Sequence, residues 1–153
     1  MLLVSIHNRL CYANGVPHTK GEKILAEELK KILYVEDDLD IRAVVRLALQ
    51  AFGEYTLLVC SSGPEAIEKV ADFGPDLFLL DVMMPGMDGP QTLTEMRKIP
   101  GLELVPAIFL TAKVQPEEIA HYEDLGALEV IAKPFDPTQL CNRIKDVWES
   151  QYF

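Results

Sequence analysis

Residues 77–90 read LFLLDVMMPGMDGP, and this stretch contains the end of a predicted strand and the start of the helix after it. Residues 77–80 form a short run that is apolar on both faces, as in a strand buried inside a parallel sheet. The glycines and prolines that follow predict a loop, and Asp88 and Gln91 have the spacing of a helix capping box. Asp81 is therefore expected at the carboxyl end of a core strand, where open α/β sheets bind their ligands.

From residue 31 onward, short apolar runs alternate with segments that have helical periodicity. The expected strands are Ile32–Val35, Tyr55–Cys60, Leu77–Asp81, Ala107–Leu110 and Glu129–Ala132. Five repeats of strand then helix predict right-handed crossovers and a parallel sheet covered on both faces, which is a three-layer αβα fold.

The first predicted helix carries an apolar stripe that we expect to pack on the sheet. The residues of this stripe are Ile41, Val44, Val45, Ala48 and Phe52. Arg42, Arg46 and Gln50 lie off the stripe.

Composition limits the class of protein. A chain of 153 residues with 49% hydrophobic and 25% charged residues is typical of one soluble globular domain. The formal net charge of -10 disfavours direct binding to nucleic acid or to an anionic membrane surface. Three widely spaced cysteines, Cys11, Cys60 and Cys141, indicate reduced thiols and a cytoplasmic location.

The chain divides into three parts. Residues 1–30 have no clear periodicity and are expected to be a poorly ordered extension, residues 31–150 form the domain, and residues 151–153 are a tail. Because the sequence stops just after the fifth predicted helix, we expect the domain to act alone, without an attached effector domain.

Polar side chains follow four of the five predicted strands. They are Glu36, Asp37, Asp81, Thr111 and Lys133. If the strands are neighbours, three carboxylates share one pocket and repel each other, and Mg²⁺ bound through oxygen ligands would offset this repulsion. A carboxylate can attack phosphorus to form an acyl phosphate, whose transition-state charge an ammonium group stabilises. Simpler roles remain open: the acidic pair could favour a helix N-terminus, and Thr111 could bond to backbone at its strand end.

Four motifs in this order resemble the receiver domain of bacterial two-component response regulators. They are KILYVEDD at 31–38, LLDVMMPGMDG at 79–89, FLTA at 109–112 and KPF at 133–135. The resemblance covers residues 31–150 and implies a flavodoxin-like, doubly wound five-stranded sheet in the order 2-1-3-4-5. It also implies a cis bond between Lys133 and Pro134.

The resemblance also implies a role for each residue of the pocket. Asp81 would be the phospho-acceptor, with Thr111 as the switch hydroxyl and Lys133 as the lysine that pairs with phosphate. Glu36, Asp37 and Asp81 would hold Mg²⁺ together with the backbone carbonyl of Met83. The donor would be a histidine kinase or a histidine phosphotransfer protein, and the signal would pass by protein binding or phosphorelay to a downstream protein.

Two departures from the family pattern involve three positions. Val130 stands where an aromatic switch residue is frequent, which puts a coupled movement of Thr111 and an aromatic ring in doubt. Met83 and Lys113 occupy positions where the family tunes dephosphorylation, so the lifetime of the acyl phosphate is expected to be altered.

We expect a phospho-acceptor with at most slow self-dephosphorylation, and therefore no enzyme. One alternative is an aspartate-nucleophile phosphatase, but such enzymes generally place a second acid where Met83 stands. The other alternative is a pseudo-receiver, a protein-binding module with this fold that is never phosphorylated.

Overall fold

The computed structural model describes residues 12–13, 16–17 and 28–152. Over these ranges the chain forms one five-stranded parallel sheet and a separate two-stranded antiparallel pair. The strands are β1 (Tyr12–Ala13), β2 (Val16–Pro17), β3 (Lys31–Val35), β4 (Thr56–Cys60), β5 (Leu77–Asp81), β6 (Ala107–Thr111) and β7 (Ala127–Ala132). Most of the predicted extension at 1–30 lies outside the described residues, as does Phe153.

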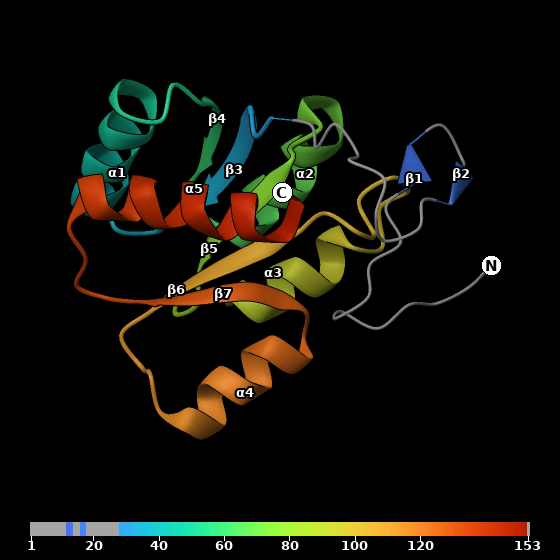
Figure 1. Ribbon diagram of the computed structural model, residues 1–153. Coiled ribbons are helices and arrows are strands. Elements are labelled where there is room, and N and C mark those ends of the chain that lie inside the picture. Colours follow the sequence, from blue (N-terminus) through green and yellow to red (C-terminus); the bar gives the residue numbers. More distant parts are fainter. Residues whose placement is uncertain (1–11, 14–15, 18–27, 153) are drawn as a thin grey trace.

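The parallel sheet has the order β4-β3-β5-β6-β7 (Figure 1). Since β3 is the first strand of the domain and β4 the second, this is the order 2-1-3-4-5 and confirms the flavodoxin-like prediction. Strand β7 begins two residues earlier than predicted, because Gly126 turns the chain with a φ of 91° and pairing with β6 resumes at Ala127.

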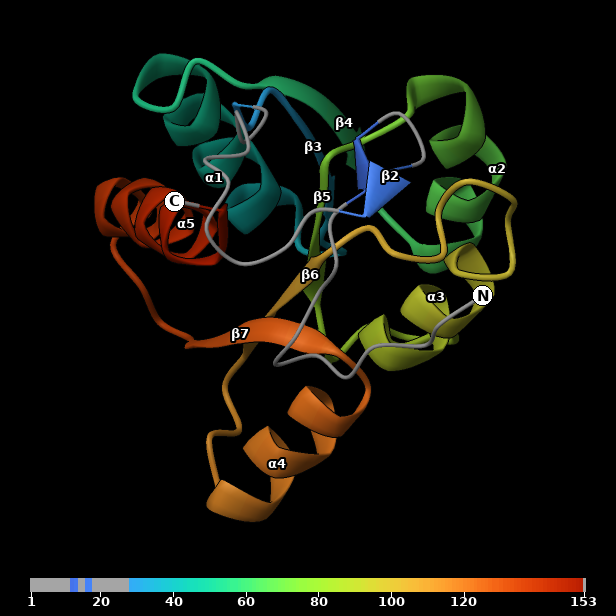
Figure 2. The same ribbon diagram turned by 45° about the vertical axis from the view of Figure 1, so that its right-hand side comes forward.

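Five helices cover the two faces of the sheet. They are α1 (Leu39–Ala51), α2 (Gly63–Phe73), α3 (Gly89–Met96), α4 (Pro116–Asp124) and α5 (Pro137–Tyr152). Figure 2 shows α1 and α5 on one side of the sheet and α2 and α3 on the other. Tyr122, the buried residue of α4, joins the cluster of α2 and α3. None of the described helices is long and apolar enough to span a bilayer.

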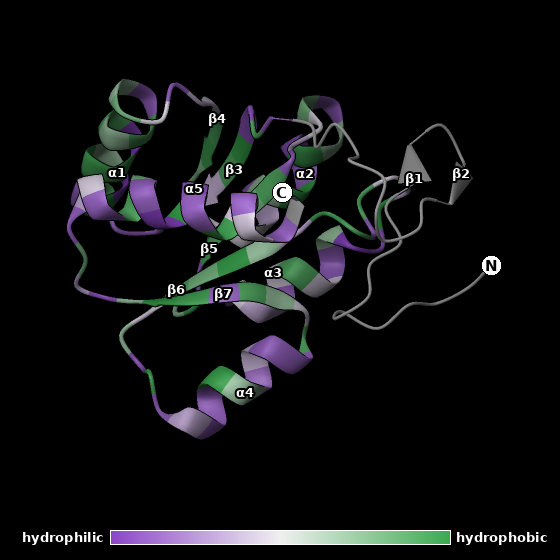
Figure 3. Ribbon diagram, in the orientation of Figure 1, coloured by the Kyte–Doolittle hydropathy of each residue, from purple (hydrophilic) through white to green (hydrophobic). Residues whose placement is uncertain are grey.

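The central strands supply the floor of both hydrophobic clusters. Every residue of β5 and β6 is buried, and Figure 3 shows these strands as largely hydrophobic while polar residues gather on the outer helices. Alternate residues of each strand point to opposite faces, so Phe78 and Leu80 pack under α2 and α3, whereas Leu77 and Leu79 pack under α1 and α5. The buried ends of these strands therefore present their last side chains on a rigid base.

The inward face of α1 differs from the predicted stripe. Val45, Ala48 and Leu49 are the buried residues of this helix. Val44 and Phe52 were expected to pack on the sheet, but they are 52% and 65% exposed. Apolar residues cover more than one face of this helix, so the pattern fitted two orientations, and packing against α5 selects the one that buries Leu49.

Gly89, the first residue of α3, lies in close contact with the backbone of β5. Its N–H donates to the carbonyl of Val82 at 2.9 Å, and a Cβ built on it would lie 2.4 Å from the carbonyl oxygen of Asp81. Backbone cannot move aside as a flexible side chain can. Only glycine therefore lets α3 start this close to the residue that ends β5.

We expect Gly89→Ala to lower the free energy of unfolding by about 2–3 kcal/mol, measured by urea unfolding, because the new methyl group overpacks against backbone. Gly86→Ala in the same loop is the control. Gly86 has a φ of 76° with open space around it, so that substitution should cost only about 1–2 kcal/mol of backbone strain. Equal losses in the two variants would contradict the contact argument.

Candidate functional site

Three carboxylates meet at the carboxyl edge of the sheet. Asp81 is the last residue of β5, and Glu36 and Asp37 directly follow β3, which pairs with β5 so that Val35 lies opposite Leu80. One oxygen from each carboxylate lies within 4.8 Å of the other two. Glu36 and Asp81 are 1% and 4% exposed, whereas Asp37 is open to solvent. The predicted convergence of the three acids is present in the structure.

Lys133 reaches the same place from the connection between β7 and α5. Its Nζ lies 2.8 Å from Oε2 of Glu36 and 2.9 Å from Oδ1 of Asp81, so one ammonium group bridges two buried carboxylates. Its backbone N–H donates to the carbonyl of Thr111 at 2.8 Å, and its peptide bond to Pro134 is cis, as predicted. Lys133 therefore points into the pocket.

Thr111 ends the neighbouring strand β6. It is buried, and it lies one residue beyond Leu110, the register partner of Asp81. Its hydroxyl accepts a hydrogen bond from the backbone N–H of Lys113 at 3.0 Å. The structure thus places Thr111 at the same sheet edge as the acids, with its hydroxyl bonded to backbone, as the simpler interpretation of this residue expected.

The donor set of the pocket suits a hard cation. Three carboxylates and one ammonium leave two uncompensated negative charges, and all the anionic donors are oxygens. Such oxygen sets bind Mg²⁺, which keeps several of its own waters. Glu36, Asp37 and Asp81 would hold the ion. Met83, in the loop two residues after Asp81, is half exposed.

Burial controls the protonation of the central carboxylate. Removal from water raises the pKa of Asp81 to about 6; the hydrogen bond from Lys133 opposes this rise, and the charge of Glu36 adds to it. Burial lowers the pKa of the Lys133 ammonium, but its hydrogen bonds to Glu36 and Asp81 outweigh burial and leave the pKa raised. Without a cation, the pocket therefore holds ionised Asp81 at a cost in stability.

We expect Asp81→Asn to be more stable than the wild type in Mg²⁺-free buffer at neutral pH, by about 1–2 kcal/mol. Because the folded-state pKa of about 6 lies above the ordinary value of 3.8, the folded protein binds the extra proton and loses stability as pH rises through this interval. The advantage of the variant should therefore vanish below about pH 4. Urea unfolding at several pH values measures it.

Asp72→Asn, which changes an exposed acid on α2, is the control for loss of one negative charge. If Asp72→Asn stabilised the protein as much as Asp81→Asn, the effect would come from net charge. If the wild type were the more stable protein at neutral pH, the cost assigned to ionised Asp81 would be wrong.

Two residues beside the pocket were not recognised from the sequence. The sequence pattern placed Arg42 off the apolar stripe of its helix and gave it no role. Its Nη1 donates to the carbonyl oxygens of Glu36 at 2.8 Å and Asp37 at 3.3 Å. Tyr34, two residues before Glu36, is fully buried, and its hydroxyl has no hydrogen-bond partner among the described residues. Burial raises the pKa of Tyr34, and the charges of Glu36 and Asp81 raise it further, so the phenol stays neutral. The only feature of the sequence that could have indicated this contact is the position of Arg42, six residues after Glu36 and five after Asp37.

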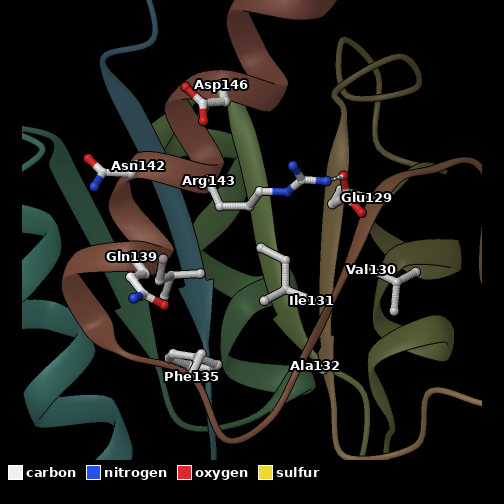
Figure 4. A pocket seen from close by; sticks show the side chains of 10 residues that line it. Glu129, Val130, Ile131, Ala132, Phe135, Gln139, Asn142, Arg143 and Asp146 are labelled. Atoms are coloured by element: carbon white, nitrogen blue, oxygen red, sulfur yellow. Dashed lines mark hydrogen bonds and ion pairs between the residues drawn. The ribbon is translucent and has the colours of Figure 1, made fainter.

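One hollow of the described surface lies away from the acids. It has a volume of about 420 Å³ and lies between β7 and α5, where Figure 4 shows Ile131 and Phe135 below the ion pair of Arg143 with Glu129. This ion pair has a distance of 2.6 Å. None of the residues of the acidic pocket lines this hollow, and the hollow is open to solvent. We therefore assign no ligand to it.

Comparison with known proteins identifies the family. The family model of the response regulator receiver domain matches residues 32–145. The DNA-binding response regulator MtrA of Mycolicibacterium paratuberculosis is 34% identical over 116 residues, which are 76% of this chain and 50% of MtrA. The transcriptional regulatory protein PhoP of Bacillus subtilis is 34% identical over 118 residues, which are 77% of this chain and 48% of PhoP. This chain spans about half the length of these curated relatives.

Solved structures give the same result. The chemotaxis response regulator CheY4 of Vibrio cholerae superposes with a TM-score of 0.72 at 29% identity, over 78% of this chain and 99% of CheY4. A CheY-like receiver domain protein from Methanospirillum hungatei gives a TM-score of 0.70 at 27% identity, over 81% and 97% of the two chains. By sequence and by fold, this chain belongs to the response regulator receiver domain family.

Proposed function

We propose that this receiver domain accepts a phosphoryl group on Asp81 from a phosphohistidine. The observation that carries the proposal is the Lys133 ammonium, which bridges the buried carboxylates of Glu36 and Asp81 at 2.8 and 2.9 Å. A buried carboxylate beside a fixed ammonium can act as a nucleophile while the ammonium stabilises negative charge on the incoming oxygens. The family assignment favours this chemistry over the phosphatase alternative.

In the transfer, an oxygen of Asp81 forms a bond to phosphorus as the bond from phosphorus to the imidazole nitrogen breaks. The electron pair of the broken bond stays on the imidazole, and Asp81 becomes an acyl phosphate. Bound Mg²⁺ supplies charge neutralisation on the phosphoryl oxygens. Glu36 and Asp37 orient the pocket for that ion, and the Met83 carbonyl is the proposed further ligand.

After transfer, Lys133 and Thr111 are the groups of this chain that can contact the new phosphoryl group. The Lys133 ammonium forms ion pairs with two carboxylates in the present structure. It can form the same kind of pair with the negatively charged phosphoryl oxygens. The Thr111 hydroxyl would leave the Lys113 N–H to donate a hydrogen bond to phosphate. Val130, partly buried beside the core, offers no aromatic ring to follow this movement.

The partners of this domain follow from its charge and from the family. We propose a histidine kinase or a histidine phosphotransfer protein as donor, and a downstream protein that binds the phosphorylated form or takes the phosphate onward. The relatives MtrA and PhoP act on DNA or transcription by name, yet the net charge of -10 disfavours direct DNA contact by this chain. A cytoplasmic location remains a prediction from the reduced cysteines.

The proposal is tested with acetyl phosphate and Mg²⁺, followed by intact-mass analysis. We expect a mass increase of one phosphoryl group that depends on Mg²⁺ and is removed by hydroxylamine, the reagent for acyl phosphates. Beryllofluoride, which mimics the acyl phosphate, should bind under the same conditions. A protein that does not bind Mg²⁺, or does not bind beryllofluoride, would instead favour the pseudo-receiver alternative.

A further inference from the structure

We infer that Arg42 is a positioning residue that holds the acidic connection between β3 and α1 in the conformation that binds a cation. This inference rests on the proposed function, because it concerns the Mg²⁺ site of that function. Arg42 touches neither Asp81 nor the carboxylates of the acidic pair in the contacts described above. Its hydrogen bonds go to the two backbone carbonyls of that pair.

The acidic pair sits on a three-residue connection, residues 36–38, and not within the sheet. The connection is fixed at its start by the N–H of Glu36, which donates to the carbonyl of Cys60 at 3.1 Å. It is fixed at its end by Asp38, whose side chain caps α1 by accepting from the N–H groups of Asp40 and Ile41. Between these two points, Arg42 binds the carbonyls from the first turns of α1.

The hydrogen bonds from Arg42 to the connection matter most for the position of Asp37. Glu36 is already fixed by its ion pair with Lys133, whereas the Asp37 side chain is exposed and no described cation forms an ion pair with it. Two like charges about 4 Å apart repel by about 4 kcal/mol at an effective dielectric constant near 20. An unrestrained connection would relieve this repulsion by turning Asp37 into water. The bonds from Arg42 oppose that movement while the site has no cation.

The direction in which the Mg²⁺ affinity changes on loss of Arg42 distinguishes a positioning role from a purely electrostatic one. Removing a positive charge close to a cation site should, by Coulomb attraction alone, strengthen cation binding. Removing a group that orients the ligands should weaken it, typically by 10–100-fold for residues that orient metal ligands. We therefore expect loss of Arg42 to weaken Mg²⁺ binding, against the Coulomb direction.

The test uses three variants of the full chain. Arg42→Met keeps most of the apolar stem and removes the guanidinium that donates to both carbonyls. Arg42→Lys keeps the charge on a shorter side chain, and Arg46→Met removes a charge one turn away. Arg46 is exposed, and no hydrogen bond or ion pair involves it among the described residues. Calorimetric titration with Mg²⁺ and electron paramagnetic resonance of free Mn²⁺ give the dissociation constants, and urea unfolding gives the stability of each protein.

We expect Arg42→Met to raise the dissociation constant for both ions by about tenfold, with Arg42→Lys between it and the wild type. Arg46→Met should bind as the wild type or slightly tighter. Wild-type affinity in Arg42→Met, or a loss of stability without a loss of affinity, would overturn the inference. If Arg42→Met does not fold, wild-type affinity in Arg42→Lys would overturn it. A wild type that binds neither ion would instead refute the proposed function.

Discussion

Asp81→Asn is expected to abolish phosphoryl labelling by acetyl phosphate in the presence of Mg²⁺. An amide is a far weaker nucleophile than a carboxylate, and the substitution changes no volume in a site that is 4% exposed. Because the variant is also expected to be the more stable protein without Mg²⁺, loss of labelling cannot be attributed to unfolding. Intact-mass analysis after a fixed incubation measures the labelled fraction.

The matched control is Asp72→Asn, which should label as the wild type does. Glu36 and Asp37 are carboxylates of the same pocket and provide a sharper internal check, since one of them could in principle accept the group instead. If Asp81→Asn retained a hydroxylamine-sensitive phosphoryl group, the acceptor would be another residue, and the role given to Asp81 would be wrong.

The pocket was predictable from sequence because its residues are tied to strand ends. A short apolar run such as residues 77–80, followed by glycines and prolines, indicates a buried strand, so the carboxylate after it is expected at the sheet edge. The strand order was supplied by the family resemblance. It places β3 beside β5 and leaves only β6 between β5 and β7, so Lys133, which follows β7, can reach Glu36 and Asp81.

The predictions that were wrong concern the rotation of a helix about its axis and the atoms that a side chain reaches, which a hydrophobic pattern does not specify. The orientation of α1 was predicted about one residue out of phase, with Val44 assigned to the core in place of Leu49. Ser62 and Glu65 also have the spacing of a capping box. Ser62 does cap α2, but Glu65 accepts from the N–H and hydroxyl of Ser61 and does not close a box with Ser62. Side-chain reach of this kind is decided by local rotamers, which spacing does not specify.

Lys133→Met is expected to slow labelling of Asp81 by about 10²–10³-fold at neutral pH, the usual cost of removing one charge-stabilising donor from a reaction site. Two effects act in the same direction. The phosphoryl oxygens lose their ammonium partner, and the pKa of Asp81 rises further because the hydrogen bond from Lys133 that lowers it is gone. A larger share of the carboxyl groups is then protonated and cannot attack.

The dependence of the labelling rate on pH separates these two effects. At sub-saturating Mg²⁺, protons and the cation compete for Asp81. Raising the pH should then restore the part of the loss that comes from protonation, so the half-maximal rate of Lys133→Met should lie at higher pH than that of the wild type. The remaining deficit at the plateau is the lost stabilisation of the phosphoryl oxygens. Lys145→Met, which changes an exposed lysine on α5, should leave both quantities unchanged. A plateau equal to the wild type would restrict Lys133 to setting the protonation of Asp81, and an unchanged pH midpoint would restrict it to contacting phosphate.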